Sequence, residues 1–257
     1  MTVTLNILAM PKLQKYIHKI RRYKEKLKKI ITRIGISYPI EFELDDEPSK
    51  RLILPCHLGI LFFGDFDVSF FKTIKIDLNY IFDSFFFNVR NLGGYNFTVK
   101  LFYKGVKKEY REMKKSSDKI KIHPTNKFYQ ILINKRIEEN LGMILAITDL
   151  PIFSSNNDNI LFLYGETHLK HRCCIVSSLK LKEQFYNRPE NRDLFEERIL
   201  KEIIHEVGHL ILGPNHCHNY FCVMKFSKDI YKIDEKKKEL CETCKIKLNT
   251  IREELNF

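Results

Sequence analysis

Residues 204–217 constrain this chain more than any other stretch, because they place two histidines and a glutamate at helical spacing. Positions four apart lie on one face of a helix, so His205 and His209 can direct two imidazole rings at one metal ion. Glu206 follows the first histidine and can reach a water on that ion as a general base. The pattern therefore predicts a metal-binding helix equipped for hydrolysis.

The residues that follow supply a third ligand. Gly213 can adopt the left-handed conformation that ends a helix, and Pro214 prevents the helix from resuming. The chain can then fold back and bring His216 to the same ion, giving the three protein ligands and open position of hydrolytic zinc sites. A capping box at Asp193 and Glu196 predicts the start of the helix. Apolar residues recur along it at helical spacing: Phe195, Ile199, Ile203, Val207, Leu210 and Ile211.

Four cysteines follow the helix as two close pairs, Cys217 with Cys222 and Cys241 with Cys244. Two such pairs, separated by a longer connection, are typical of a closed tetrahedral zinc site that stabilises a fold. A redox role for the second pair is the alternative, but no thioredoxin-like βαβ pattern surrounds it. The sequence therefore predicts two zinc ions per chain, one catalytic and one structural. Two further cysteines lie in a strand-like run and are expected to be plain buried thiols: Cys173 and Cys174.

These motifs resemble those of the archaemetzincins, whose pattern is HExxHxxGxxH-Cys, then Cys-x-Met and a distal Cys-x-x-Cys. Here the histidine motif is followed by Cys222-Val223-Met224 and by the pair Cys241 and Cys244. The resemblance is strong from about residue 142 to the end, weaker over 57–141 and absent from the first 55 or so residues. Three upstream stretches are similar to strands of the family: 144–149, 161–165 and 175–181.

The resemblance implies a zinc metallopeptidase that acts on peptides or proteins. It implies an α+β fold of the zincin or metzincin type, with a mixed twisted sheet, an active-site helix and a small C-terminal subdomain built on the four-cysteine zinc site. Met224 would form the Met-turn, a hydrophobic floor beneath the zinc. An edge strand would line the cleft and bind substrate through main-chain hydrogen bonds. Its residues would be Leu161, Phe162, Leu163, Tyr164 and Gly165.

This chain departs from the family pattern between its second and third histidines, and its connection from Met224 to Cys241 is one residue shorter than usual. The interval from His209 to His216 is one residue longer than the family pattern, and the extra residue falls within 210–212. A bulge at the helix end could absorb it; otherwise His216 would miss the metal and His218 would be the spare candidate. Phe226 stands where some other metzincins carry a tyrosine after the Met-turn. The group that stabilises the developing oxyanion is therefore left open.

Positive charge is concentrated at the N-terminus. The net charge is +12, and the first 34 residues hold 10 Lys or Arg against one acid, which accounts for +9. Residues 12–34 are expected to form an amphipathic basic helix within an N-terminal extension, residues 1–55. We interpret it as a helix packed on its own domain; the alternatives are a nucleic-acid or acidic-partner surface, or a surface for a helical partner or a membrane. The peptidase-like domain would span 56–257, and its C-terminal subdomain 213–257.

The rest of the chain alternates strand-like and helix-like patterns, which implies a mixed sheet with helices packed on it. The run at 143–148 is continuously apolar, as expected of a buried parallel strand. Further strands are expected at 58–63, 96–103, 161–165 and 172–179, and helices at 65–87 and 128–141. The lack of an 18-residue apolar run or a signal peptide, together with thiols available for zinc, favours a cytoplasmic protein without a membrane span. The chain is expected to be a monomer.

Two other functions also fit the sequence. The first is a non-catalytic zinc protein of the same fold, in which the extra residue leaves the histidine site loose. The second is a nucleic-acid-binding module built from the basic helix and the four-cysteine element. Metal-dependent peptide cleavage would favour the peptidase, whereas salt-dependent nucleic-acid binding lost on deletion of residues 1–34 would favour the last alternative.

Overall fold

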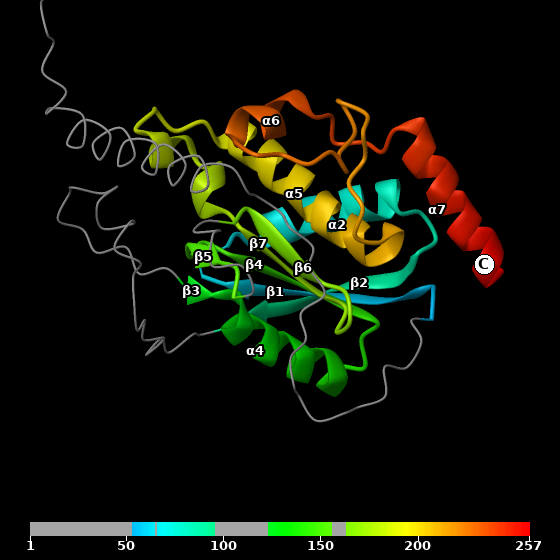
Figure 1. Cartoon of the computed structure of the whole chain (residues 1–257). Coiled ribbons are helices and arrows are strands. Elements are labelled where there is room, and N and C mark those ends of the chain that lie inside the picture. The colour runs from blue at the N-terminus through cyan, green and yellow to red at the C-terminus, as the bar shows by residue number, and fades with distance from the viewer. Residues whose placement is uncertain (1–52, 65, 96–122, 156–162) are drawn as a thin grey trace, which may run out of the picture.

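The computed structural model describes residues 53–64, 66–95, 123–155 and 163–257. Its centre is a five-stranded mixed sheet with the order β2-β1-β4-β7-β6 (Figure 1). Neighbouring strands are parallel except at the β6–β7 pair, which is antiparallel and leaves β6 at one edge. The strands are β1 (Cys56–Phe63), β2 (Phe86–Gly94), β4 (Met143–Thr148), β6 (Gly165–His168) and β7 (Cys173–Ser177).

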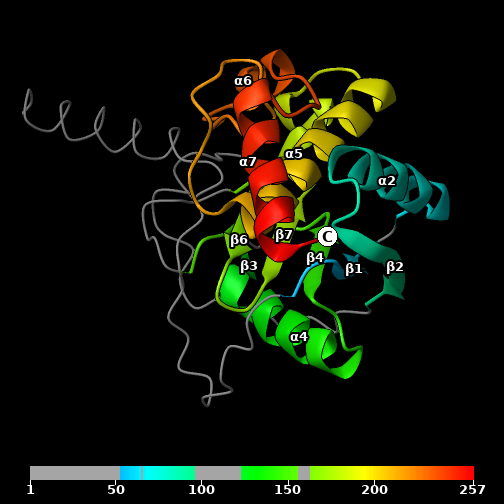
Figure 2. The ribbon, with the colours of Figure 1, turned by 90° about the vertical axis from the view of Figure 1, so that its right-hand side faces the viewer.

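Helices cover both faces of this sheet, as Figure 2 shows from the side. One face carries α2 (Val68–Ile81) and the long α5 (Arg192–Leu212), and the other carries α4 (Thr125–Glu138). The core is accordingly divided into two clusters, one on each face of the sheet. The smaller elements are β3 (His123–Pro124), β5 (Ile152–Phe153), η2 (Leu179–Leu181), η3 (Glu183–Tyr186), α6 (Ile230–Glu235) and α7 (Glu242–Leu255).

The central strands explain why the sheet can hold helices on both faces. All six residues of β4 and all five of β7 are buried, so side chains pointing to either face are covered by helices. The apolar run predicted at 143–148 therefore forms the expected parallel strand. Cys173 and Cys174, on β7, are fully buried free thiols, which confirms that expectation.

The predicted helix at 65–87 is too long. α2 ends at Ile81, and the residues from Phe86 form β2, parallel to β1. The break lies at Ser84, which has a φ of 67° that a helix cannot accommodate. The apolar spacing misled the prediction because Phe82 and Phe85, on either side of this turn, both pack in the core.

Other boundaries shift by a few residues. The helix predicted at 128–141 spans Thr125–Glu138, and the strand predicted at 172–179 ends at Ser177 before a 3-10 turn. The strand predicted at 161–165 is also misplaced, because β6 only begins at Gly165. The predicted helix at 12–34 and strand at 96–103 lie outside the described residues. Among the described residues, no helix is both long enough and apolar enough to cross a bilayer.

Candidate metal centre and active site

The helix α5 carries the histidine motif in its C-terminal half. Its N-cap is Asn191, whose side-chain oxygen accepts a hydrogen bond from the main-chain N–H of Leu194 at 3.0 Å. The capping box predicted at Asp193 and Glu196 is therefore wrong, since Asp193 lies inside the first turn. Glu196 instead pairs with Arg192 on the helix surface. The helix is buried from residue 198 to 211, so the half that carries the histidines is held on the sheet.

His205 and His209 face one another across one turn of α5, with their Nε2 atoms 3.1 Å apart. Their Nδ1 atoms lie 2.8 Å from the main-chain oxygens of Val223 and Gly213 respectively. A carbonyl oxygen can only accept, so each Nδ1 carries the proton and donates, which leaves both Nε2 lone pairs directed at a common point. Burial lowers the pKa of His209 to about 3 and that of His205 well below its ordinary value. Both rings are therefore neutral, as metal ligands must be.

His216 completes the group. One ring nitrogen from each of His205, His209 and His216 lies within 4.8 Å of the others. At a Zn–N distance of about 2.0 Å, tetrahedral ligand nitrogens stand about 3.3 Å apart, so the three rings need only small adjustments to hold one ion. His218 is exposed and does not belong to this group.

The extra residue before Gly213 is absorbed without a helix bulge. α5 remains regular to Leu212, and the N–H of Gly213 still donates to the oxygen of His209 at 3.1 Å. Gly213 then takes φ 88° and ψ −175°, a conformation that essentially only glycine adopts. The chain turns back there, and the segment 213–215 brings His216 to the other two rings. The bulge suggested by the sequence is therefore wrong.

Glu206 lies beside the three histidines with its side chain buried. Its Oε2 accepts a hydrogen bond of 2.6 Å from the hydroxyl of Thr167 on β6. Its Oε1 has no hydrogen-bond partner within the described ranges. Burial raises the pKa of Glu206 to about 8, and the nearby carboxylates of Glu202 and Glu166 act in the same direction. Such a carboxyl group is suited to exchanging a proton near neutral pH.

Met224, the residue expected to form the Met-turn, is buried and lies against α5 at Gly208. A Cβ atom on Gly208 would stand 2.4 Å from its sulfur, so the thioether fits against the helix only because position 208 has no side chain. Phe226, two residues on, packs edge-to-face on His216 with ring centroids 5.2 Å apart. An apolar ring thus limits the movement of the third histidine.

A buried ion pair lies one turn before the histidines. Lys236 Nζ is 3.1 Å from Glu202 Oε1, and each side chain is only 1% exposed. Lys236 also donates to the main-chain oxygen of Lys225, just after Met224. The pair therefore links α5 to the loop that carries Met224. Burial is the main cause that lowers the pKa of His205, and the positive charge of Lys236 is the second.

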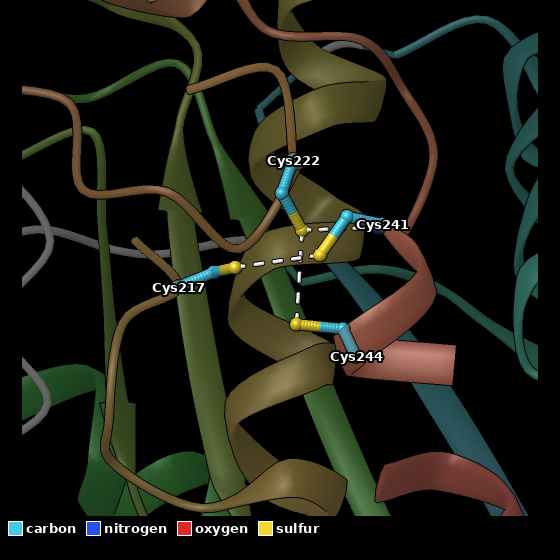
Figure 3. A group of neighbouring side chains, drawn as sticks. All are labelled: Cys217, Cys222, Cys241 and Cys244. Carbon is cyan, nitrogen blue, oxygen red and sulfur yellow. Dashed lines mark hydrogen bonds between the residues drawn. The ribbon is translucent and has the colours of Figure 1, made fainter. Parts of the chain in front are cut away.

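The four cysteines that follow α5 in the sequence converge on one point (Figure 3). Cys217 Sγ is 3.5 Å from Cys241 Sγ, and Cys222 Sγ is 3.7 Å from Cys244 Sγ. These distances are far too long for disulfides. They match the edge of a tetrahedron of sulfurs around zinc, which is about 3.8 Å for Zn–S bonds of about 2.3 Å. Main-chain N–H groups of Asn219 and Cys241 also point at two of the sulfurs.

Electrostatics favour a cation among these thiols. Burial raises the pKa of Cys222 to about 11. The pKa of Cys244 lies well above its ordinary value, mainly because the thiol is buried and secondly because Cys222 is close to it. Four thiolates could not coexist there at neutral pH without a compensating charge. A divalent cation would supply that charge and bind thiolates directly.

The predicted substrate strand is only partly described. Leu161 and Phe162 lie outside the described residues, and the side chains of Leu163 and Tyr164 are buried. Gly165 begins β6, which is an edge strand of the sheet that the described residues form. Any contact of Leu163 or Tyr164 with a substrate would therefore run through the main chain.

Several supporting groups could not be recognised from the sequence. The oxygens of Val223 and Gly213 that orient two histidines are main-chain atoms, which carry no residue signature. Lys236 begins a lysine-rich run that resembles a solvated surface. Thr167 lies far from the motif in sequence, and only the pairing of β6 with β7 brings it near Glu206.

Comparison with known proteins places these observations in a family. The sequence model of Peptidase family M54 matches residues 70–250. The archaemetzincin of Methanocaldococcus jannaschii is 38% identical over 121 residues, which are 47% of this chain and 65% of that protein. The archaemetzincin of Sulfolobus acidocaldarius is 43% identical over 106 residues, which are 41% of this chain and 56% of that protein. The matched part therefore spans less than two thirds of the length of these curated relatives.

A solved structure supports the fold independently. The crystal structure of an archaemetzincin from Methanopyrus kandleri matches with a TM-score of 0.56 and 19% sequence identity, covering 82% of this chain and 99% of that one. The match covers nearly the whole of the known protein, so the predicted metzincin-like fold, with its mixed sheet and active-site helix, is confirmed.

Proposed function

Because this chain belongs to peptidase family M54, we propose that it is a zinc-dependent metallopeptidase that hydrolyses peptide bonds. The observation that carries the proposal is the convergence of the three histidine rings beside the buried carboxyl group of Glu206. His205, His209 and His216 would hold the catalytic zinc, and Glu206 would act as general base. The regular end of α5 argues against a non-catalytic zinc protein, because the extra residue leaves the three rings together.

The mechanism follows from the placement of Glu206. A zinc ion held by the three histidines would act as a Lewis acid and make a water nucleophilic near neutral pH. Glu206 would take a proton from the attacking water while the water oxygen forms a bond to the carbonyl carbon of the peptide. As the carbon–nitrogen bond breaks, Glu206 passes the same proton to the leaving amine. The hydrogen bonds on the Nδ1 atoms of His205 and His209 keep those rings aimed during both steps.

The four cysteines would hold a second, structural zinc, which gives two zinc ions per chain. Their sulfur–sulfur distances of 3.5 and 3.7 Å suit a closed tetrahedral site with no position for a substrate. We propose that this site stabilises a C-terminal subdomain of residues 213–257 within a peptidase domain of residues 56–257. Residues 1–55 would form a separate extension.

The substrate would be a peptide or protein bound in extended form along β6, an edge strand of the sheet that the described residues form. Edge strands bind such chains through main-chain hydrogen bonds, which give affinity with little sequence preference. The segment 161–165 would supply those contacts. The requirement for reduced thiols at the four-cysteine site suits a reducing compartment such as the cytoplasm.

The test is peptide-library digestion by the zinc-loaded chain, followed by mass spectrometry, with Glu206→Gln as the variant. Replacing the general base should reduce cleavage roughly a hundredfold to ten-thousandfold while the zinc content stays the same. Glu196→Gln, the same substitution on the surface of the same helix, is the matched control and should cleave like the parent. Cleavage by Glu206→Gln at the parental rate would refute the assignment of Glu206.

A further inference from the structure

We propose that the edge strand β6 positions the general base, with Thr167 holding one carboxylate oxygen of Glu206 and Gly165 providing the space in which that carboxylate lies. The inference rests on the proposed peptidase function and adds two positioning residues to it. Neither residue belongs to the histidine motif, and both lie about 40 positions upstream of Glu206.

Thr167 makes the direct contact. Its side chain is fully buried, and its Oγ1 lies 2.6 Å from Oε2 of Glu206. A length of this kind is typical of a hydroxyl that donates to an ionised carboxylate, and such charge-assisted hydrogen bonds are stronger than neutral ones. With Oε2 held in this way, Oε1 is the oxygen left to meet the attacking water, and it has no hydrogen-bond partner among the residues that the structure describes.

The same hydroxyl can hold the carboxyl group of Glu206 whether or not Oε1 carries a proton. Oγ1 of Thr167 also lies 3.0 Å from the main-chain oxygen of Glu206. When Oε1 has taken the proton of the attacking water, Oε2 is still an acceptor and keeps the hydrogen bond that Oγ1 donates. The carboxyl group therefore keeps its position in both steps of the reaction.

Gly165 contributes by having no side chain. A Cβ atom there would stand 2.6 Å from both Cγ and Oε1 of Glu206 and 2.8 Å from its Cδ, closer than non-bonded atoms approach. Gly165 does not have a positive φ, so the position requires space rather than a special backbone conformation. Any larger residue would push the carboxylate out of the place that Thr167 gives it.

Strand geometry explains why these two residues act together. Side chains two apart on a strand point to the same face, so Gly165 and Thr167 both face α5, whereas Glu166 between them faces the other way. Gly165 pairs with Val176 and Thr167 with Cys174 on β7, which fixes the register of the edge strand. The position of Glu206 is therefore set by the sheet as well as by its own helix.

The experiment uses three variants of the full chain, Thr167→Val, Thr167→Ser and Gly165→Ala, with Thr148→Val as control. Thr148 is a buried threonine on β4 whose hydroxyl accepts a hydrogen bond from the N–H of Leu150 and does not touch Glu206. The measurements are kcat and KM for a peptide cleaved by the parent, zinc per chain, and crystal structures of the zinc-loaded parent and Thr167→Val.

We expect Thr167→Val and Gly165→Ala to lower kcat about tenfold to a hundredfold. This factor corresponds to the loss of one hydrogen bond to a charged group. KM and zinc content should change little. Thr167→Ser should restore kcat, and Thr148→Val should leave it unchanged. Parental kcat in Thr167→Val would overturn the proposal.

If the parent cleaves no peptide, the proposed peptidase function fails, but the crystal structures still test whether Thr167 positions Glu206. The Glu206 carboxylate should lie on Thr167 in the parent and leave that position in Thr167→Val. An unchanged carboxylate position in the variant would overturn the positioning role.

Discussion

Gly213→Ala tests how the chain accommodates the extra residue between its second and third histidines. Gly213 adopts φ 88° and ψ −175°, and its oxygen lies 2.8 Å from Nδ1 of His209. A Cβ atom at this position would meet nothing within 4 Å, so alanine is disfavoured by backbone conformation alone. The one substitution therefore acts on two histidines, because it disturbs the carbonyl that orients His209 and the turn that delivers His216.

The magnitude follows from that conformation. A residue with a side chain in this region costs about 1–3 kcal/mol. The chain can relieve the strain by rotating the peptide, but the rotation removes the carbonyl from His209 and shifts His216. Loss of an outer hydrogen bond to a metal ligand alone costs roughly tenfold to a hundredfold in metal affinity. With His216 displaced as well, we expect the histidine site to bind zinc at least about a hundredfold more weakly, while the four-cysteine site keeps its ion.

The assay is a zinc competition titration with a chelator, followed by zinc analysis per chain. Gly93→Ala is the matched control, because Gly93 on β2 also has a positive φ, 78°, and open space around its Cβ position. It should lose a similar amount of stability and bind both zinc ions normally. Equal zinc affinity in Gly213→Ala and Gly93→Ala would refute the role given to the turn.

Three further outcomes follow from buried charges and thiols. Burial raises the pKa of Glu166 from 4.5 to about 7, so parental stability should fall as the pH rises through that range. Glu166→Gln should remove this decline. Its free energy of unfolding, measured with urea, should rise relative to that of the parent by up to about 3 kcal/mol between pH 4 and pH 8. A constant difference would contradict the shift. Lys236→Met should cost about 3–5 kcal/mol by leaving Glu202 buried and unpaired, and Glu202→Gln in the same chain should recover part of it. Cys244→Ser should release one zinc ion and lower the melting temperature; an unchanged zinc count would count against the four-cysteine site.

The sequence predicted which histidines and which cysteines lie close together, because their spacing is local or strongly patterned. His205 and His209 share a helix face by periodicity alone, and paired thiols need only a closed loop to meet. The position of His216 could not be decided in the same way. Whether one extra residue is absorbed depends on the backbone angles of Gly213, which the sequence permits but does not determine.

The fold was predictable where apolar patterns were unambiguous, as in β4. The prediction failed around Ser84, where phenylalanines on both sides of a turn continued a helical spacing and concealed the start of β2. The contact between Thr167 and Glu206 was out of reach for another reason. It depends on the register of an edge strand against β7, and register is set by the assembled sheet rather than by local residues.

The decisive measurement for a three-histidine zinc site is the number of zinc ions bound per chain, determined by native mass spectrometry on the parent and on His216→Ala. We expect two zinc ions in the parent and one in His216→Ala. Two ions in both would mean that another group, such as His218, is the third ligand. One ion in both would mean that the three histidines do not form a zinc site, and the proposal of a peptidase would fall with it.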